Sequence, residues 1–336
     1  MDVIYLSHPV FALHDTGSWH PERPARLEAA ARGVDSSALN VRRVDAPEIE
    51  RSLLHLVHRP QYVDAIERFC RAGGGSLDPD TVAVLDSWEA ALRAAGAGPE
   101  AVRLLDESPD ASAFLAVRPP GHHALVNRAM GFCLFNNAAI TAAVLRDRGQ
   151  RVAIVDWDVH HGNGTQDSFD ADPDILYISV HQYPFYPGGG AVDETGTGAG
   201  LGRVVNVPVP AGTGGDVYRH LFERLIGPVL SQFSPDWILV SAGYDAHEED
   251  PLAELRLLAW DYGFMASQLT SHVPANRIVT FLEGGYHLPA ITTSVASTLR
   301  GYAGVAEDHD PRRSPMVSWD AVEQAVVVAA RAWDVA

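Results

Sequence analysis

Short apolar runs rich in β-branched residues recur along the chain, and segments with helical periodicity separate most of them. Helical spacing of apolar positions occurs at residues 24–32, 137–148, 217–233 and 259–272. Strands that alternate with helices predict an α/β fold with a central, mostly parallel eight-stranded sheet and helices on both faces. The runs that we expect to form its buried strands are residues 3–6, 41–44, 113–117, 152–155, 175–180, 204–207, 237–240 and 278–282.

The pattern continues along the whole chain without an internal repeat or a low-complexity linker. The glycine-rich segments at 73–76 and 188–202 are typical of functional loops rather than of joints between domains. Because 46% of the 336 residues are hydrophobic, the chain can bury a substantial core. We therefore expect a single catalytic domain over residues 1–336.

Composition narrows the classes of partner and location. A formal net charge of −18 disfavours nucleic acid, which needs a basic surface, and favours cationic substrates. No apolar run is long enough to span a bilayer, and Asp2 lies where a secretory signal would be positive, so we expect a cytoplasmic protein. Two cysteines cannot form a disulfide framework or a thiolate zinc cluster. The chain contains no lysine, which excludes Schiff-base chemistry on a lysine.

Polar residues follow the apolar run at 152–155 immediately and in a dense group. Asp156, Asp158 and His160 lie two residues apart, so continued strand alternation would place Asp158 and His160 on the same side. Gly162 and Gly164 tighten the backbone behind them. A carboxylate and an imidazole that meet at the end of a buried strand are suitable ligands for a divalent metal ion.

Four other strand ends carry similar chemistry. In an open α/β sheet, ligands bind in loops at the carboxyl ends of the strands, so these residues should meet at one edge. They are His122 and His123 after 113–117, His181 after 175–180, Asp245 after 237–240, and Glu283 and Tyr286 after 278–282.

A catalytic metal site needs about three protein ligands and open positions for water and substrate. Asp158 and His160 supply two ligands, and Asp245 is the best candidate for the third. An ion held in this way acts as a Lewis acid and lowers the pKa of a bound water. These residue types predict a hydrolytic centre rather than a structural metal site.

The tandem imidazoles of His122 and His123 can act as general base and general acid near neutral pH. Asp156 and Asn163 are candidate hydrogen-bond partners that would fix the imidazole tautomers. Tyr286, which follows a Gly-Gly turn, can donate a hydrogen bond to an oxyanion. Together with a metal ion, this set suits the attack of metal-activated water on an amide or ester carbonyl.

Six motifs in order resemble the arginase–deacetylase superfamily and, within it, the zinc-dependent histone deacetylase family. The resemblance runs from about His20 to beyond Tyr286, and it implies the arginase–deacetylase fold. Asn163 and Glu283 resemble the class II branch, which includes bacterial deacetylase-like enzymes and acetylpolyamine amidohydrolases, rather than class I. The motifs are RPPGHHA (118–124), GFCLFNNAAI (131–140), DWDVHHGNGTQ (156–166), HQYPFYPG (181–188), SAGYDAH (241–247) and LEGGY (282–286).

The resemblance assigns roles to the catalytic residues. His123 would be the general base and then the general acid, with His122 as a mainly electrostatic partner held by Asp156. Asn163, which stands where class I enzymes have an aspartate, would steer His123 without adding charge. Tyr286 would polarise the acyl carbonyl. One zinc ion would be bound by Asp158, His160 and Asp245.

The resemblance also implies a narrow substrate tunnel and two further features of the site. Arg26, in HPERPARLEA (20–29), matches an arginine near an internal acetate-release cavity. The tunnel residues would be Gly131, Phe132, Tyr186 and Gly284, with Leu252 at the mouth and Asp80 as a rim carboxylate that grips the substrate. A potassium ion would be bound by Asp156, Asp158, His160, Ser179 and the backbone of Val180.

The leading hypothesis is a zinc-dependent amidohydrolase that acts on acetyl-lysine or acetyl-polyamine substrates. One alternative is a two-manganese ureohydrolase of the same superfamily, and another is a non-catalytic protein that binds acyl-lysine. A polyamine enzyme would need additional rim carboxylates, for which Asp80, Glu194 and Glu254 are candidates. The substrate, the acyl-chain length, the native metal and the oligomeric state stay open, with loops 73–84 and 183–202 as candidate contacts in a homo-oligomer.

Overall fold

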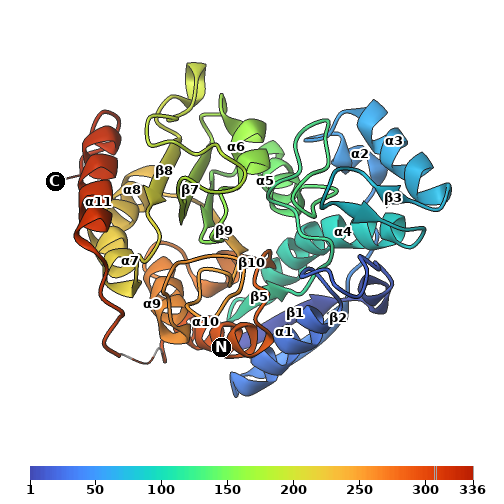
Figure 1. The fold of residues 1–336 in the computed structure, drawn as a ribbon, viewed down its shortest axis with the longest axis horizontal. Helices are drawn as coiled ribbons and strands as arrows, with labels where there is room; N and C mark the ends of the chain where they lie inside the picture. Colours follow the sequence, from blue (N-terminus) through green and yellow to red (C-terminus); the bar gives the residue numbers. More distant parts are fainter. Residues whose placement is uncertain (306, 308, 336) are drawn as a thin grey trace.

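A parallel eight-stranded sheet runs through the middle of the protein in the order β2-β1-β5-β10-β9-β6-β7-β8 (Figure 1). The computed structural model describes residues 1–305, 307 and 309–335. All eight predicted apolar runs fall on these strands, so the predicted sheet is confirmed and its neighbouring strands are all parallel. The strands are β1 (Asp2–Ser7), β2 (Asn40–Asp45), β5 (Ala111–Leu115), β6 (Val152–Asp156), β7 (Ile175–Gln182), β8 (Val204–Val209), β9 (Trp237–Ala242) and β10 (Ile278–Leu282).

Successive residues of each central strand enter hydrophobic cores on opposite faces of the sheet, as the two-residue period of a strand requires. In β1, Val3 and Tyr5 belong to one core, whereas Ile4 and Leu6 belong to the other. Both faces are therefore apolar, which explains the continuous hydrophobic runs in the sequence.

Helices cover both of these faces (Figure 1). The helices on the first core are α1 (Ala25–Ser36), α7 (Gly215–Leu221), α8 (Gly227–Phe233), α9 (Ala259–Leu269), α10 (Leu288–Tyr302) and α11 (Met316–Ala329). Those on the second core are α2 (Arg51–Leu54), α3 (Pro60–Arg71), α4 (Ser87–Asp106), α5 (Asn137–Asp147) and α6 (Asn163–Phe169).

The predicted helical segments correspond to α1, α5, the α7–α8 pair and α9, with small differences at their ends. A π-helical turn, Phe222–Ile226, joins α7 to α8. The sequence pattern did not identify α2, α3, α10 or α11, nor the short antiparallel pair β3 (Gly75–Ser76) and β4 (Val82–Ala83). Among the described residues, no helix combines the length and hydropathy needed to cross a bilayer.

The strand order also explains where the chemistry gathers. The five strands that the sequence marked by polar residues at their ends, β5, β10, β9, β6 and β7, are consecutive neighbours in the sheet. Because all are parallel, their carboxyl ends lie at one edge, and the loops that follow them meet there.

Candidate metal and catalytic site

Asp158, His160 and Asp245 form a group that could hold a metal ion, with one ligand atom from each lying within 4.8 Å of the others. His160 Nδ1 lies 3.1 Å from Asp158 Oδ1 and 3.2 Å from Asp245 Oδ2. Strand β6 ends at Asp156, so the prediction that strand alternation continues through Asp158 and His160 is wrong. The two lie in a turn in which the His160 N–H donates to Asp158 Oδ1 at 2.9 Å.

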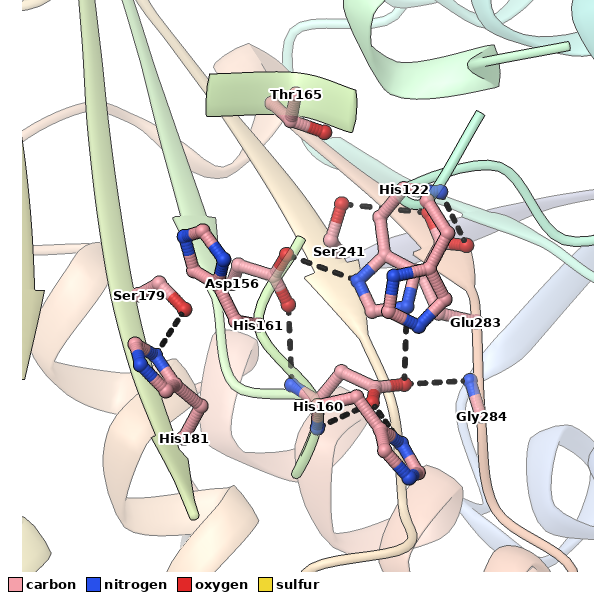
Figure 2. Close-up of polar contacts among 12 residues, drawn as sticks. His122, Asp156, His160, His161, Thr165, Ser179, His181, Ser241, Glu283 and Gly284 are labelled. Atoms are coloured by element: carbon pink, nitrogen blue, oxygen red, sulfur yellow. Dashed lines mark hydrogen bonds and ion pairs between the residues drawn. The ribbon is translucent and has the colours of Figure 1, made fainter. Parts of the chain in front are cut away.

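The backbone holds both carboxylates of this group in place. The Gly284 N–H donates to Asp158 Oδ2 at 2.7 Å (Figure 2). The Val159 N–H donates to Asp245 Oδ1 at 3.0 Å. A Cβ on Gly284 would lie 2.0 Å from Asp245 Oδ2, and one on Gly243 would lie 2.0 Å from Asp158 Oδ2. Only glycine leaves room for the carboxylates at these two positions.

The protonation of the group fits a divalent cation. Asp245 Oδ2 is buried and has no hydrogen-bond partner among the described residues, so an acceptor is left for a ligand ion. Burial alone would lower the pKa of His160, but Asp158 and Asp245 outweigh it and raise that pKa to about 9. A cation between the three side chains would take the place of this proton and release it on binding.

The two tandem histidines have opposite charge preferences. His122 Nδ1 donates to Asp156 Oδ2 at 3.1 Å, and Asp158 and Asp156 raise the pKa of His122 to about 10 despite its burial (Figure 2). His123 Nδ1 lies 2.8 Å from Asn163 Oδ1. Burial and the neighbouring His122 and His160 hold the pKa of His123 well below 6.5. At neutral pH, His122 is therefore cationic and His123 is neutral.

The tautomer of His123 follows from its neighbour. Because Asn163 presents its carbonyl oxygen, His123 must carry its proton on Nδ1 and donate it there. The Nε2 lone pair is then free to accept a proton. The imidazole of His123 is thus arranged as a base.

Tyr286 is held beside these histidines by a carboxylate that sequence reasoning missed. Asp250 Oδ2 accepts hydrogen bonds from the Tyr286 and His287 N–H groups at 2.7 and 3.1 Å, and Asp250 Oδ1 accepts one from the Leu252 N–H. Burial and Asp245 raise the pKa of the Tyr286 phenol well above 10, so it remains a hydrogen-bond donor. Asp250 thus links the backbone of Tyr286 to the loop that carries Leu252. No sequence motif around Asp250 indicates this contact.

A cavity of about 230 Å³ opens onto this group. His123 and Tyr186 meet edge to face with ring centroids 5.2 Å apart, and Phe132 and Tyr286 do so at 6.1 Å. Aromatic rings therefore flank the histidines and the tyrosine. The lining contains each residue assigned to the tunnel, and its members are Asp80, Pro120, His122, His123, Gly131, Phe132, His160, Tyr186, Leu252, Gly284 and Tyr286.

The candidate rim carboxylates fall in different places. Asp80 lines the cavity, and burial together with Asp78 raises its pKa. Glu194 does not line it, because its carboxylate accepts from the Gly190 and Ala191 N–H groups and from Gln166. Glu254 is exposed and is also absent from the lining. Of the three rim candidates, only Asp80 borders the cavity.

Arg26 is fully buried behind Tyr286, with its guanidinium carbon 5.2 Å from the centre of the phenol ring. It donates to the Gly285 and Glu283 carbonyl oxygens and pairs with Glu22 at 3.0 Å. Glu22 also receives a bidentate hydrogen bond from Arg118. This pair of arginines on one carboxylate was not recognised in the sequence, because Glu22 and Arg118 lie 96 residues apart.

Glu283 supports the histidine loop from behind. Its buried carboxylate accepts from the His122 N–H at 3.2 Å and the Ser241 hydroxyl at 3.3 Å (Figure 2). It also accepts from the Gly121 N–H at 2.7 Å. Burial raises the pKa of Glu283 to about 7, although the charge of His122 acts in the opposite direction. Glu283 thus holds the loop that positions His122, and its carboxyl group can bind a proton near neutral pH.

Residues 20–302 match the histone deacetylase domain. The chain belongs to the histone deacetylase family. It is 43% identical over 306 residues to the uncharacterized protein slr0245 of Synechocystis sp., covering 89% of this chain and 98% of that one. It is 35% identical to a probable deacetylase of Archaeoglobus fulgidus, covering 95% and 92%. Against histone deacetylase 15 of Arabidopsis thaliana the identity is 40%, but only 53% of that longer protein is covered.

The three-dimensional structure agrees with membership of the histone deacetylase family. A crystal structure of the HDA15 HD domain superposes with a TM-score of 0.92 at 34% identity, covering 99% of this chain and 95% of that one. The predicted deacetylase fold is therefore confirmed. Family membership supports a deacetylase of the amidohydrolase type.

The raised pKa of Glu283 gives a test of its protonation. The folded state holds this proton between pH 4.5 and about 7, so the stability that it contributes is full below 4.5 and is lost as pH rises through 7. We expect the free energy of unfolding of the wild type to fall relative to Glu283→Gln by roughly 2–3 kcal/mol between pH 5 and 8. Urea unfolding of both proteins at equal metal content measures this difference.

Glu194→Gln is the matched control, because the pKa of Glu194 is lowered by Gln166 and backbone N–H groups despite partial burial. Its difference from the wild type should not vary between pH 5 and 8. Parallel curves for the wild type and Glu283→Gln would show that Glu283 is ionised throughout this range.

Proposed function

We propose that the chain is a zinc-dependent amidohydrolase that removes an acetyl or other short acyl group from the amine at the end of an extended chain. Acetyl-lysine and acetyl-polyamines have this form. The observation that carries the proposal is the group of Asp158, His160 and Asp245, whose His160 lines the same cavity as His123 and Tyr286. We further propose that residues 1–336 form one catalytic domain, because one sheet carries the whole site.

Asp158, His160 and Asp245 would hold the zinc ion, since two carboxylates and one imidazole leave coordination positions open. When bound, the ion would supply Lewis-acid activation of a water and of the acyl carbonyl. We also keep as a proposal a potassium ion near Asp156 and Ser179, whose hydroxyl lies 2.9 Å from His181 Nδ1.

The protein residues would share the proton transfers. His123 Nε2 would take a proton from the attacking water as its oxygen forms the new bond to the carbonyl carbon. The Tyr286 hydroxyl would donate to the carbonyl oxygen as negative charge develops there. His123 would then give the proton to the amide nitrogen while the C–N bond breaks, which yields the amine and a carboxylic acid. The acid would lose the second water proton to the amine or to solvent, so that a carboxylate leaves. The cationic His122 would favour the anionic transition state.

The cavity supports a slender substrate arm. Phe132 and Tyr186 flank its opening to the histidines, and their rings can pack against the methylene groups of a lysine or polyamine. Asp80 borders the same cavity and would attract an N–H group or a positive charge beyond the arm. Because Asp80 alone of the three rim candidates borders this cavity, the rim fits a peptide backbone better than a polyamine.

A two-manganese ureohydrolase is the alternative within the superfamily. It would need a second set of ligands, and the part of the chain that the structure describes contains one group of three metal-ligating side chains. Elemental analysis should find about one zinc per chain, and two equivalents of manganese would favour the alternative.

The first test compares acetate release from an acetyl-lysine peptide, acetylputrescine and acetylspermidine. Removal of the metal by a chelator should abolish turnover, and added zinc should restore it. Tyr286→Phe should lower kcat by about 100- to 1,000-fold, because one hydrogen bond to the oxyanion is lost. Tyr302→Phe is the matched control, since that buried phenol bonds Thr280 on another part of the fold and should leave kcat unchanged.

Undiminished turnover in the metal-free protein would contradict the metal-dependent mechanism. Saturable binding of an acetylated peptide without turnover by the zinc-loaded protein would instead favour the non-catalytic binding hypothesis. The ratio of kcat/KM between the peptide and the two acetyl-polyamines assigns the substrate class.

The second test concerns the low pKa of His123. Asn163→Asp would place a carboxylate about where Asn163 Oδ1 now accepts the Nδ1 proton, and a negative charge there stabilises the imidazolium. The acid limb of the kcat/KM profile should move to higher pH by about one unit. A pH–rate profile of both proteins measures the shift, and an unmoved acid limb would mean that His123 is not the titrating base.

A further inference from the structure

A second cavity, of about 540 Å³, lies outside the proposed active site. It is bordered by β8 at the edge of the sheet, by α11 and the residues that follow it, and by the loop that leads into β8. Helix α11 packs against β8 at this edge (Figure 1). Its lining shares no residue with the 230 Å³ cavity of the active site. Its size suits a small organic molecule.

The walls of this edge cavity are apolar on two sides. Val205 of β8 belongs to the same hydrophobic core as Ala329 of α11, and both line the cavity. Leu201, Val328 and Trp333 add to the apolar surface. The Trp333 indole N–H donates to the Gly202 carbonyl at 2.9 Å, which fixes the ring. A ligand could therefore bury a hydrocarbon or aromatic body here.

The charges around the edge cavity are unlike those of the rest of the molecule. The chain has 43 acidic and 25 basic residues, and four further cavities are each lined by at least one carboxylate. The edge cavity is lined by Arg203 and Arg331 and by no aspartate or glutamate. It is a local positive site on an acidic protein.

The neighbours of Arg203 hold its guanidinium in place without neutralising its positive charge. Its guanidinium carbon lies 5.0 Å from the centre of the Trp333 ring and 5.5 Å from that of Phe233, and its Nε–H donates to the Pro173 carbonyl. Neither Arg203 nor Arg331 forms an ion pair with a carboxylate among the described residues. Their charge remains available for an anion.

A buried polar atom adds independent evidence for a ligand. Asn206 lines the edge cavity and is only 2% exposed. Its Nδ2 donates to Gln166 Oε1 at 2.8 Å and to the Glu194 carbonyl at 3.2 Å, which fixes the orientation of the amide. Its Oδ1 accepts no hydrogen bond from the described residues. A buried acceptor without a donor can be satisfied by an N–H or O–H group of a ligand.

We propose that the edge cavity binds a small amphipathic organic anion. The apolar body lies between β8 and α11, the acidic head binds Arg203 and Arg331, and a donor on the ligand reaches Asn206 Oδ1. This site is independent of the proposed deacylase activity, because none of its residues belongs to the catalytic group.

The probe is 8-anilinonaphthalene-1-sulfonate, which has an aromatic body, one anionic head and one N–H donor, and which fluoresces when it enters an apolar site. Its matched control is N-phenyl-1-naphthylamine, the same body without the sulfonate. We expect saturable binding of the sulfonate by the full zinc-loaded chain, and binding of the neutral analogue about tenfold weaker or more. Equal affinity for the two probes would overturn the anion site.

Variants locate the probe. Arg203→Gln combined with Arg331→Gln should weaken sulfonate binding about tenfold or more, whereas Arg68→Gln, an exposed arginine on α3 without an ion pair among the described residues, should not. Thr195→Phe, at a partly exposed position in the lining, should block the cavity without touching either arginine. Far-ultraviolet circular dichroism and turnover of the acetylated substrate verify that each variant is folded. Unchanged affinity in the double arginine variant and in Thr195→Phe would overturn the proposal.

Competition then identifies the head group. Octanoate and octyl phosphate carry similar bodies with a carboxylate or a phosphate, and at least one should displace the sulfonate from the wild type. The compound that displaces the sulfonate at the lower concentration indicates whether the site prefers a carboxylate or a phosphate head group. Displacement by neither compound would overturn the assignment.

Discussion

The arrangement of the site depends on two carboxylates that lie side by side in the protein interior. Asp158 and Asp245 have no exposed surface, and each lies within 3.2 Å of the same His160 nitrogen. Taking two like charges out of water is unfavourable unless backbone donors and a cation compensate. Donors come from the Gly284 and Val159 N–H groups, which reach the site only because β10 and β6 end at the same edge. The parallel sheet is thus what makes this cluster of charge possible.

The same arrangement gives two adjacent histidines different chemical characters. His122 faces the carboxylate of Asp156 and holds a proton, whereas His123 faces the amide of Asn163 and does not. Both are buried, so exposure does not distinguish them. Asp158 and Asp156 raise the pKa of His122, whereas burial and the neighbouring His122 and His160 lower the pKa of His123, which has only a neutral hydrogen-bond partner. Glu283 acts on His122 indirectly, because it accepts a hydrogen bond from the backbone N–H of His122 rather than from the imidazole.

The sequence allowed much of this to be predicted, and what it missed has physical reasons. Strands buried on both faces are continuous apolar runs, and motifs at their ends placed the candidate metal ligands in one region. Helix α4 lacks a regular apolar period because Gly96, Gly98 and Pro99 interrupt its pattern, although close packing of α4 on α5 requires a small residue at Gly98. Asp250 bonds only backbone N–H groups, which have no sequence signature. The edge cavity depends on β8 and the C-terminal residues after α11, such as Trp333, which meet only in the folded chain.

Gly243 and Gly284 lie so close to the two carboxylates that a Cβ on either glycine would clash with a carboxylate oxygen, and backbone N–H groups hold both carboxylates. The ligand oxygens are therefore set in position during folding, and metal binding requires little further ordering of side chains. Such a rigid receptor discriminates among cations by ionic radius and preferred geometry, since it cannot expand to suit a larger ion. Divergence of substrate preference among relatives of this chain would then arise in the loops around the opening, while the floor beneath the carboxylates stays invariant in shape.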